Sequence, residues 1–444
     1  MFEKPDFMDR INRENRGGLL LGIDLGVSYA QISLCPGEGP APVSVKSRPE
    51  GEVYSFPALL ALYRNRYYAG YDAETIAQLP EAVSFENVFA LAMEQDMVMA
   101  GGRNYNTWEL LHHFLRLSLQ LAQGYGRPDR AGAVMFTTYL PQDPAKQERA
   151  YKILARATGQ LFSKKTRMYL QTRQESLFHF FLNDQEKLWK SNVLIFDYQK
   201  EGMTGWYCTV EGNTAPWSVH FTPLVPEKMP RLPSLEERAQ RGQELDGAFY
   251  GFLRQFQDKP YHLTWLLGDG FKGDWAVQSL DLLLDNGRVF QGNNVYSQGA
   301  CLTLMQMEDE EAGSDYLLLN DTDIRYHIGL NCRRQGLLTE NLAEEYIPVF
   351  QAGTHVGRCH DRIYVLPDQG EDLIVLAQSA RDGQMKRLRV PSGELADKPL
   401  GENRLMVEFD FLNLSTLRIQ VTDAGLGNLV PGSGRTVTET FTLD

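Results

Sequence analysis

Residues 20–34 read LLGIDLGVSYAQISL and contain the feature that decides the fold. An apolar run ends in Asp-Leu-Gly, and alternating polar and apolar residues follow, so the stretch predicts two strands joined by a turn. Gly26 at this turn would let backbone N–H groups approach a phosphate closely, and Asp24 could hold a metal-bound water. The competing interpretation is an ordinary β-hairpin with a turn glycine.

The composition limits the classes of partner and compartment. A length of 444 residues favours two or three domains, and a net charge of −13 argues against nucleic acid or an anionic membrane as the main partner. No apolar run reaches the ~18 residues that a membrane span needs, and the charged N-terminal stretch does not resemble a secretory signal. The five cysteines are far apart and form no CxxC, so we expect a cytoplasmic protein without disulfides or structural zinc.

Strand and helix patterns alternate over residues 18–307, after a polar tail at residues 1–17. The clearest helix is residues 107–123, where apolar residues recur at helical spacing. Two strands and a helix start are expected in 55–74, and a hairpin in 191–210. A strand followed by a helix is expected in each of three further segments, 132–159, 166–182 and 262–280. Two more helices are expected, one over residues 235–256 and a closing one over residues 293–304.

The last third of the sequence changes character. An acidic, glycine-containing stretch begins at Glu308, and we expect a linker over residues 308–320. Beyond it, residues 321–444 contain only short β-type segments separated by turn residues, a pattern typical of an antiparallel β-sandwich.

Taken in order, these segments resemble the seventy-kilodalton heat-shock chaperones, a branch of the actin-like ATPase superfamily. The resemblance covers nearly the whole chain from Leu20 onward and includes GIDLG with the following Ser28 and Tyr29, the segment GAVMFTTYLPQDPAKQERAYKILARATG and the late hairpin RLMVEFDFLNLSTLRIQVTDAGLG. It implies an α/β actin-like two-lobed ATPase fold followed by an antiparallel β-sandwich. Compared with the family pattern, we expect a protein without the helical lid and without most of one subdomain of the nucleotide domain.

The resemblance also implies a place for ATP or ADP with Mg²⁺, between two phosphate loops and an adenosine loop. It assigns no catalytic residue and no metal ligand. The residues that would contact nucleotide are Asp24, Gly26, Ser28 and Tyr29 of the first loop, Asp197 and Lys200 of the second, and Gly268, Asp269 and Gly270 of the third.

The second loop departs most from the family pattern. It reads Asp-Tyr-Gln-Lys-Glu-Gly where the family has Asp-Leu-Gly-Gly-Gly-Thr. Because glycine supplies the close backbone approach that a phosphate cradle needs, Tyr198, Gln199 and Lys200 are expected to fill or distort the cradle. Lys200 could still offer a positive charge to a phosphate.

Two further departures concern the family's catalytic positions. Glu74 stands where the chaperones have a lysine, and a carboxylate there would repel the γ-phosphate. The family's catalytic glutamate corresponds to either Thr172 or Glu175. The adenosine loop, GDGFKGD, lacks the Ser-Arg pair that stacks on the base.

Three hypotheses follow from this combination. The first is a chaperone-like protein with a silent ATPase domain, whose β-sandwich binds an extended peptide or a segment of a partner protein. The second is a working ATP-dependent chaperone or switch, in which Asp24, Ser28, Asp197 and Lys200 hold the phosphates and the linker residues 317–319 dock in response. The third is a cytoskeletal or assembly protein. Asp24 and Asp197 could also be no more than inherited turn residues.

Overall fold

The computed structural model describes most of the chain and divides it into two compact units. Unit 1 comprises Met1–Cys208 and Thr222–Ala312, and unit 2 comprises Thr209–Phe221 and Gly313–Asp444. Helices and strands alternate in unit 1, whereas unit 2 is almost entirely β-structure. The described residues are 2–3, 18–35, 41–140, 143–183, 192–212, 216–226, 229–308, 315–320, 322–334, 343–395, 403–427 and 430–443.

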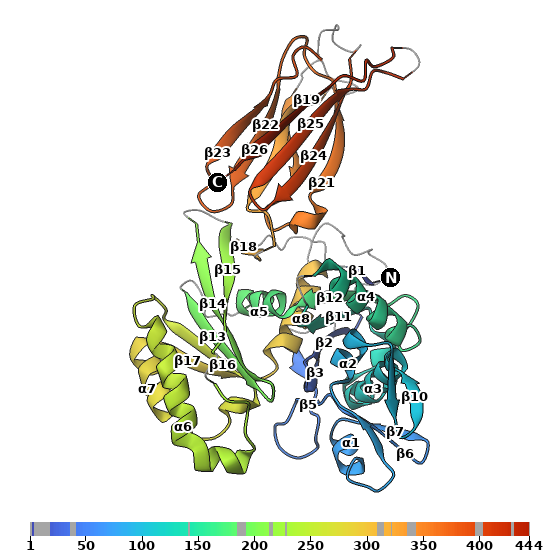
Figure 1. Cartoon of the computed structure of the whole chain (residues 1–444), viewed down its shortest axis with the longest axis vertical. Helices are drawn as coiled ribbons and strands as arrows, with labels where there is room; N and C mark the ends of the chain where they lie inside the picture. Colours follow the sequence, from blue (N-terminus) through green and yellow to red (C-terminus); the bar gives the residue numbers. More distant parts are fainter. Residues whose placement is uncertain are drawn as a thin grey trace. The chain divides into compact units, whose positions relative to one another are not determined.

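A seven-stranded mixed sheet forms the first half of unit 1 (Figure 1). Its order is β1-β12-β11-β2-β3-β4, with β5 paired to β3. The β2–β3 hairpin is antiparallel, while β1, β12, β11 and β2 run parallel, so their carboxyl ends meet at one edge. The strands are β1 (Phe2–Glu3), β2 (Leu20–Leu25), β3 (Tyr29–Cys35), β4 (Val43–Ser44), β5 (Phe56–Pro57), β11 (Ala133–Thr138) and β12 (Arg167–Thr172).

Helices cover one face of this sheet and two small sheets lie beside it. Leu110 and Phe114 of α3 and Leu154 of α4 share one core with Ile23 and Phe136 of the strands. The small sheets have the orders β7-β6-β8 and β10-β9. The elements are β6 (Leu60–Tyr63), β7 (Arg66–Ala69), α1 (Gly70–Ile76), β8 (Val83–Phe85), α2 (Val88–Glu94), β9 (Met97–Ala100), β10 (Arg103–Asn106), α3 (Thr107–Leu121) and α4 (Pro144–Thr158).

A second sheet, with the order β17-β16-β13-β14 in unit 1, forms the other half of that unit. Strands β13 and β14 form an antiparallel hairpin, whereas β16 and β17 run parallel to β13. Helices α6 and α7 cover one face (Figure 1), burying Phe249 and Leu283 against Phe196. The elements are β13 (Val193–Gln199), β14 (Gly202–Glu211), α6 (Leu235–Leu253), β16 (Leu263–Leu267), α7 (Val277–Asn286) and β17 (Arg288–Gly292).

Two helices lie between these sheets and bring the strand ends together. Helix α8 (Val295–Glu308) buries Cys301 and Leu304 against Leu20 of the first sheet. Helix α5 (Arg173–Leu182) packs beside α8, and its Phe181 ring lies 5.7 Å from the ring of Trp265 on β16. The first residues of α5 and α8 therefore lie near the carboxyl ends of β2 and β13, where the predicted loops are.

Unit 2 contains two antiparallel four-stranded sheets, with the orders β20-β19-β22-β23 and β21-β24-β25-β26. Alternate residues of both sheets, among them Val375, Val407 and Ile419, point into one shared hydrophobic core. Strand β15 pairs in parallel with β18. The strands are β15 (Trp217–Leu224), β18 (Tyr316–Leu319), β19 (Tyr326–Arg334), β20 (Ala343–Phe350), β21 (His360–Val365), β22 (Leu373–Ser379), β23 (Met385–Val390), β24 (Leu405–Asn413), β25 (Thr416–Asp423) and β26 (Thr436–Thr442).

The individual elements follow the sequence patterns closely. The helix expected over 107–123 is α3, and the hairpin expected over 191–210 is β13–β14. Two segments differ: Phe2–Glu3 of the expected tail forms β1, and Tyr316–Leu319 of the expected linker forms β18. The rest of the tail, and residues 309–314 of the linker, lie outside the described residues.

Candidate functional site

The centre of the candidate site is a buried arginine that begins helix α5. Thr172 caps this helix by accepting from the backbone N–H of Glu175 (3.1 Å), and the Glu175 carboxylate accepts from the Thr172 N–H (2.5 Å). This reciprocal capping box fixes the first turn of the helix. Thr172 and Glu175, the two candidates for the family's catalytic glutamate, are thus both used to cap the helix, and Arg173 between them reaches into the site.

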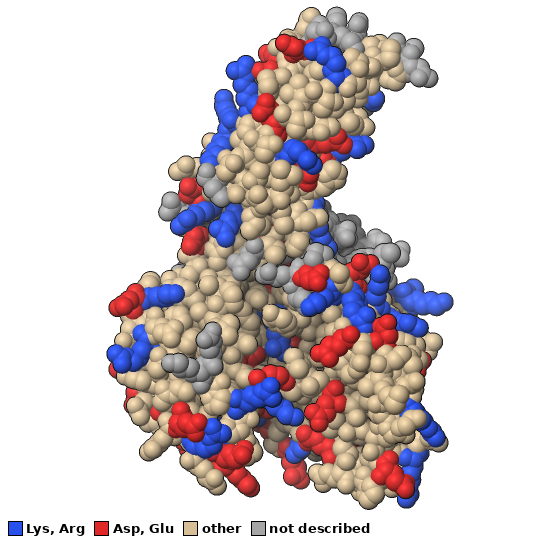
Figure 2. Space-filling model, viewed as in Figure 1, with Lys and Arg blue, Asp and Glu red and all other residues tan. Residues whose placement is uncertain are grey.

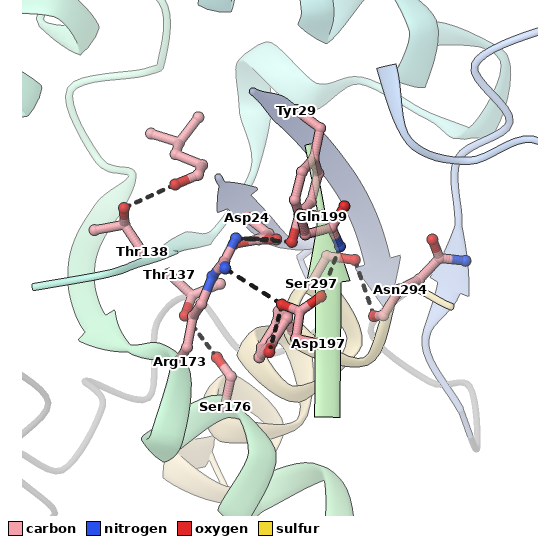
Figure 3. A network of polar contacts seen from close by, with 12 residues as sticks. Asp24, Tyr29, Thr137, Thr138, Arg173, Ser176, Asp197, Gln199, Asn294 and Ser297 are labelled. Atoms are coloured by element: carbon pink, nitrogen blue, oxygen red, sulfur yellow. Dashed lines mark hydrogen bonds and ion pairs between the residues drawn. The ribbon is translucent and has the colours of Figure 1, made fainter. Parts of the chain in front are cut away.

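Arg173 joins the aspartates of the two predicted phosphate loops (Figure 3). One guanidinium nitrogen lies 3.3 Å from Oδ2 of Asp24, and another lies 3.5 Å from Oδ2 of Asp197. The side chain of Arg173 is 11% exposed, and those of Asp24 and Asp197 are 0% and 1% exposed. A cation supplied by the chain itself therefore lies between the two carboxylates.

Aromatic and amide groups complete this ion-pair network, which we define as Asp24, Arg173, Asp197, Tyr29 and Tyr296. The guanidinium donates to the Tyr29 hydroxyl (2.7 Å) and lies 4.5 Å from the centre of the Tyr296 ring. The Tyr296 hydroxyl donates to Asp197 (2.9 Å), and so does the side-chain amide of Gln199 (2.7 Å). Such pairing is what permits two carboxylates to be buried together.

Burial dominates the proton equilibria of the network. It raises the pKa of Asp24 to about 6, although Arg173 and the Tyr29 hydroxyl act in the opposite direction. It also raises the pKa of Asp197, again against the effect of Arg173. Burial opposes the charge of Arg173 too, but the surrounding aspartates and tyrosines hold its pKa well above the ordinary value. Arginine therefore remains charged while Asp24 takes up a proton near pH 6.

Two loop glycines are in close contact with this network. A Cβ at Gly26 would lie 2.9 Å from a guanidinium nitrogen of Arg173 and 2.8 Å from the ring of Tyr29. Gly268 has φ +88°, and a Cβ there would lie 2.5 Å from the Gln199 amide nitrogen. A backbone oxygen is also too close at both positions, that of Tyr29 at 2.9 Å for Gly26 and that of Tyr198 at 2.5 Å for Gly268, so both positions require glycine.

A side chain of the second loop, Tyr198, packs directly against the backbone of the third loop at Gly270. Tyr198 is fully buried, and a Cβ at Gly270 would overlap its ring. The Tyr198 hydroxyl donates to the carbonyl of Pro230 (3.0 Å). Arg238 donates to the carbonyl of Asp269 (2.7 Å), so the polar backbone of this loop is bonded within the protein.

The remaining predicted residues lie farther out. The Lys200 side chain is 73% exposed, with its Nζ 3.9 Å from a carboxylate oxygen of Glu86. Asp269 is half-exposed and pairs with Lys272 at 2.7 Å. Ser28 is half-buried, and its carbonyl accepts from the N–H of Ala58 (2.9 Å). Glu74 is exposed on α1. The structure thus brings Asp24, Gly26, Tyr29, Asp197 and Gly268 together and leaves Lys200 outside.

Arg173 is the residue that sequence reasoning missed. It is far from both aspartates in the sequence, so no local motif marks it. One local signal was present: the first position of a helix disfavours a positive charge, because the helix dipole is positive there. An arginine at that position indicates a compensating acidic partner elsewhere in the fold.

No group of three or more His, Cys, Asp or Glu side chains among the described residues could hold a metal ion. In the same residues no helix is long and apolar enough to cross a membrane. All five cysteines are free thiols. Figure 2 shows that acidic and basic side chains are mixed over the face in view of each unit.

Comparison with known proteins places the chain in a family. A family model described as "Family of unknown function (DUF5716) C-terminal" matches residues 41–321. A second, described as "Domain of unknown function (DUF8552)", matches residues 323–443. A search of curated proteins gave no match. Because the first family model covers well over half of the chain's length, the chain belongs to the family of unknown function DUF5716.

Proposed function

We propose that this protein is a heat-shock-chaperone-like binding protein in the cytoplasm, with an actin-like ATPase fold in unit 1 and a β-sandwich in unit 2. Unit 1 acts as a scaffold that neither binds nor hydrolyses ATP efficiently, and unit 2 binds an extended segment of a partner polypeptide. The observation that carries this proposal is the buried Arg173 between Asp24 and Asp197.

The position of Arg173 favours a silent site for an electrostatic reason. Aspartates that serve a nucleotide must face a metal ion or its bound water. Here the two carboxylates face a guanidinium at 3.3 and 3.5 Å instead. A magnesium ion would have to displace this cation, and displacement would leave a charged arginine buried without a partner, at a cost of several kcal/mol.

The loop glycines support the same conclusion by steric means. A phosphate cradle needs backbone N–H groups that face open space. The surroundings of Gly26 and Gly268 are instead filled by Arg173, Tyr29 and Gln199. Lys200, which the alternative hypothesis of an active switch needs beside the phosphates, is 73% exposed and lies near an acidic side chain.

Partner binding is assigned to the edge of the sheet that ends at β21. Among the described strands, β21 pairs with β24 alone, so its outer backbone groups are available to an added strand. Tyr364 and Leu366, 53% and 57% exposed, lie at the end of this edge. The opposite sheet ends at β20, which contains Pro348 and lacks that N–H donor. The free edge and its two exposed apolar side chains favour an extended apolar segment as the ligand.

The test is fluorescence-polarisation binding of a library of apolar heptapeptides to the full chain, with and without Mg²⁺-ATP. We expect at least one peptide to bind, with the same affinity in both conditions. The variant Tyr364→Glu should weaken binding about tenfold or more, since ~1.4 kcal/mol is a factor of ten. Met385→Glu, at a similarly exposed apolar side chain on β23, is the matched control and should leave binding unchanged.

Two results would contradict the proposal separately. An affinity that changes with Mg²⁺-ATP would refute the scaffold role of unit 1. Failure of every peptide to bind, or equal losses from Tyr364→Glu and Met385→Glu, would refute the assignment of the β21 edge.

A further inference from the structure

Three sulfur-bearing side chains meet where helix α8 packs on strand β3 of the first sheet. The Cys35 thiol, at the end of β3, donates to the thioether sulfur of Met305 on α8, and the two sulfur atoms are 3.3 Å apart. The thiol of Cys301, also on α8, is hydrogen-bonded to Cys35. We define these three residues as the sulfur cluster. None of them belongs to the ion-pair network or to the three predicted nucleotide loops.

The position of α8 brings two of these sulfurs to the third. Cys301 and Met305 are four residues apart on α8, so their side chains lie on the same face of the helix. Gly22 of β2 permits the close approach of that face to the sheet. A Cβ at Gly22 would lie 2.1 Å from the carbonyl oxygen of Ser297 and 2.8 Å from the backbone nitrogen of Cys301. The helix therefore lies close enough to the sheet for Cys301 to reach Cys35.

The sulfur cluster is shielded from water. Cys35 and Cys301 are buried in a core that includes Leu304, and Met305 is partly buried at its border. Burial raises the pKa of the Cys301 thiol well above its ordinary value, and a backbone hydrogen bond from Gly22 acts in the opposite direction. Buried, protonated thiols are poor nucleophiles, which disfavours their oxidation to a disulfide.

The three donor atoms suit a soft, monovalent metal ion. Thiolate and thioether sulfurs select Cu(I), whereas a structural zinc site needs four ligands. Metal–sulfur bonds of roughly 2.3 Å would place the ligand sulfurs of a trigonal site about 4 Å apart. Since Cys35 and Met305 are already 3.3 Å apart, a small movement of the flexible methionine side chain would open the site. One thiolate balances the charge of Cu(I), so the occupied site brings no net charge into the core.

We propose that Cys35, Cys301 and Met305 together bind one Cu(I) ion. Binding forms three copper–sulfur bonds, and the proton lost by one thiol passes to solvent. Met305 is the least buried of the three residues, so the ion reaches the thiols past its side chain. Because its ligands come from β3 and α8, bound Cu(I) ties the helix to the sheet and stabilises the folded state.

The test is an anaerobic titration of the full chain with Cu(I), kept reduced by ascorbate, against the chelator bathocuproine disulfonate. Met305→Leu removes the thioether but conserves the side-chain volume, so this variant should fold as the parent does. Cys301→Ala removes one thiol. Met203→Leu and Cys208→Ala change a buried methionine and a buried cysteine of β14, outside the sulfur cluster, and are the matched controls.

We expect the parent and both controls to retain one Cu(I) against the chelator, with an affinity loss of about tenfold or more in Met305→Leu and a larger loss in Cys301→Ala. Copper K-edge X-ray absorption should show three sulfur ligands in the parent and two in Met305→Leu. The proposal is wrong if the parent releases Cu(I) to the chelator, if Met305→Leu or Cys301→Ala binds as the parent does, or if the controls lose as much affinity. These failures would leave the proposed function standing, because peptide binding at the β21 edge is measured without copper.

Discussion

Removal of Arg173 should destabilise the protein more than any surface substitution. The variant Arg173→Met keeps most of the side chain's volume but leaves the buried carboxylates of Asp24 and Asp197 without their cation. At 3.3–3.5 Å and an effective dielectric constant of about 20, each ion pair represents roughly 4–5 kcal/mol of attraction. Breaking a buried pair by removing one partner costs ~3–5 kcal/mol in measured cases. We expect a loss of about that size in the free energy of unfolding at pH 8.

The loss in Arg173→Met should shrink as the pH falls. Without the arginine, the pKa values of Asp24 and Asp197, both already raised by burial, should rise further. A carboxyl whose folded pKa is raised binds protons in the folded state before the unfolded state does, so stability increases as the pH falls through the folded pKa. For each proton bound by these carboxyls, the free energy of unfolding should recover by up to about 1.4 kcal/mol per pH unit. Urea unfolding at pH 8, 7, 6 and 5 measures this recovery.

Two further variants make the measurement decisive. Arg241→Met removes an exposed arginine from its pair with Glu244, so it should cost less than ~1 kcal/mol at every pH. The triple variant Asp24→Asn, Arg173→Met, Asp197→Asn removes all three charges and should regain stability and lose the pH dependence. A loss below ~1 kcal/mol in Arg173→Met with no pH dependence would refute the central ion pair.

Three other expectations follow from single residues. Gly268→Ala should lower the free energy of unfolding by more than ~2 kcal/mol, whereas Gly273→Ala, at a similar positive φ but with open space around it, should lower it by only ~1 kcal/mol. Equal losses of the two variants in urea unfolding would contradict the crowding around Gly268. Asp246→Ala should lower the free energy of unfolding by ~2–3 kcal/mol, because this buried carboxylate accepts hydrogen bonds from two backbone N–H groups of α7. Thermal melting measures the loss, and a fall in Tm of less than one degree would contradict this role of Asp246. Burial lowers the pKa of His179 to about 4, so the unfolded state binds a proton there first and the protein loses stability as the pH falls from ~6.5 to ~4. The raised pKa of Asp24 has the opposite effect and adds stability as the pH falls. Asp24→Asn should therefore steepen the acid loss in unfolding at pH 7 to 4.5, and parallel slopes would disprove this.

Most secondary structure was predictable because it depends on local patterns. The helical spacing of apolar residues over 107–123 marks α3. Within 55–74, where two strands are expected, the turn at Arg64-Asn65 separates β6 from β7, and both turn residues have positive φ. The strand β18 could not be read from Tyr316–Leu319, since four apolar residues in an expected linker become a strand only through pairing with β15.

The candidate site was predictable only in part. The two hairpin motifs identified Asp24 and Asp197, and the structure brings both to one place. The motifs could not show that Arg173 lies between them, since the contact joins three segments that are distant in the chain. The motifs predict that Tyr198 fills or distorts the phosphate cradle, but they could not show where its ring lies: it is buried against Gly270 and packs with Phe271 and Trp275.

The most direct test of the silent scaffold is thermal melting of the full chain with and without Mg²⁺-ATP near 1 mM. A ligand with Kd near ten micromolar would add ~2.7 kcal/mol and raise Tm by a few degrees. We expect no change in Tm, because Arg173 and the loop side chains occupy the space and charge that nucleotide would need. A reproducible rise of several degrees with Mg²⁺-ATP, absent with Mg²⁺ alone, would contradict the scaffold role.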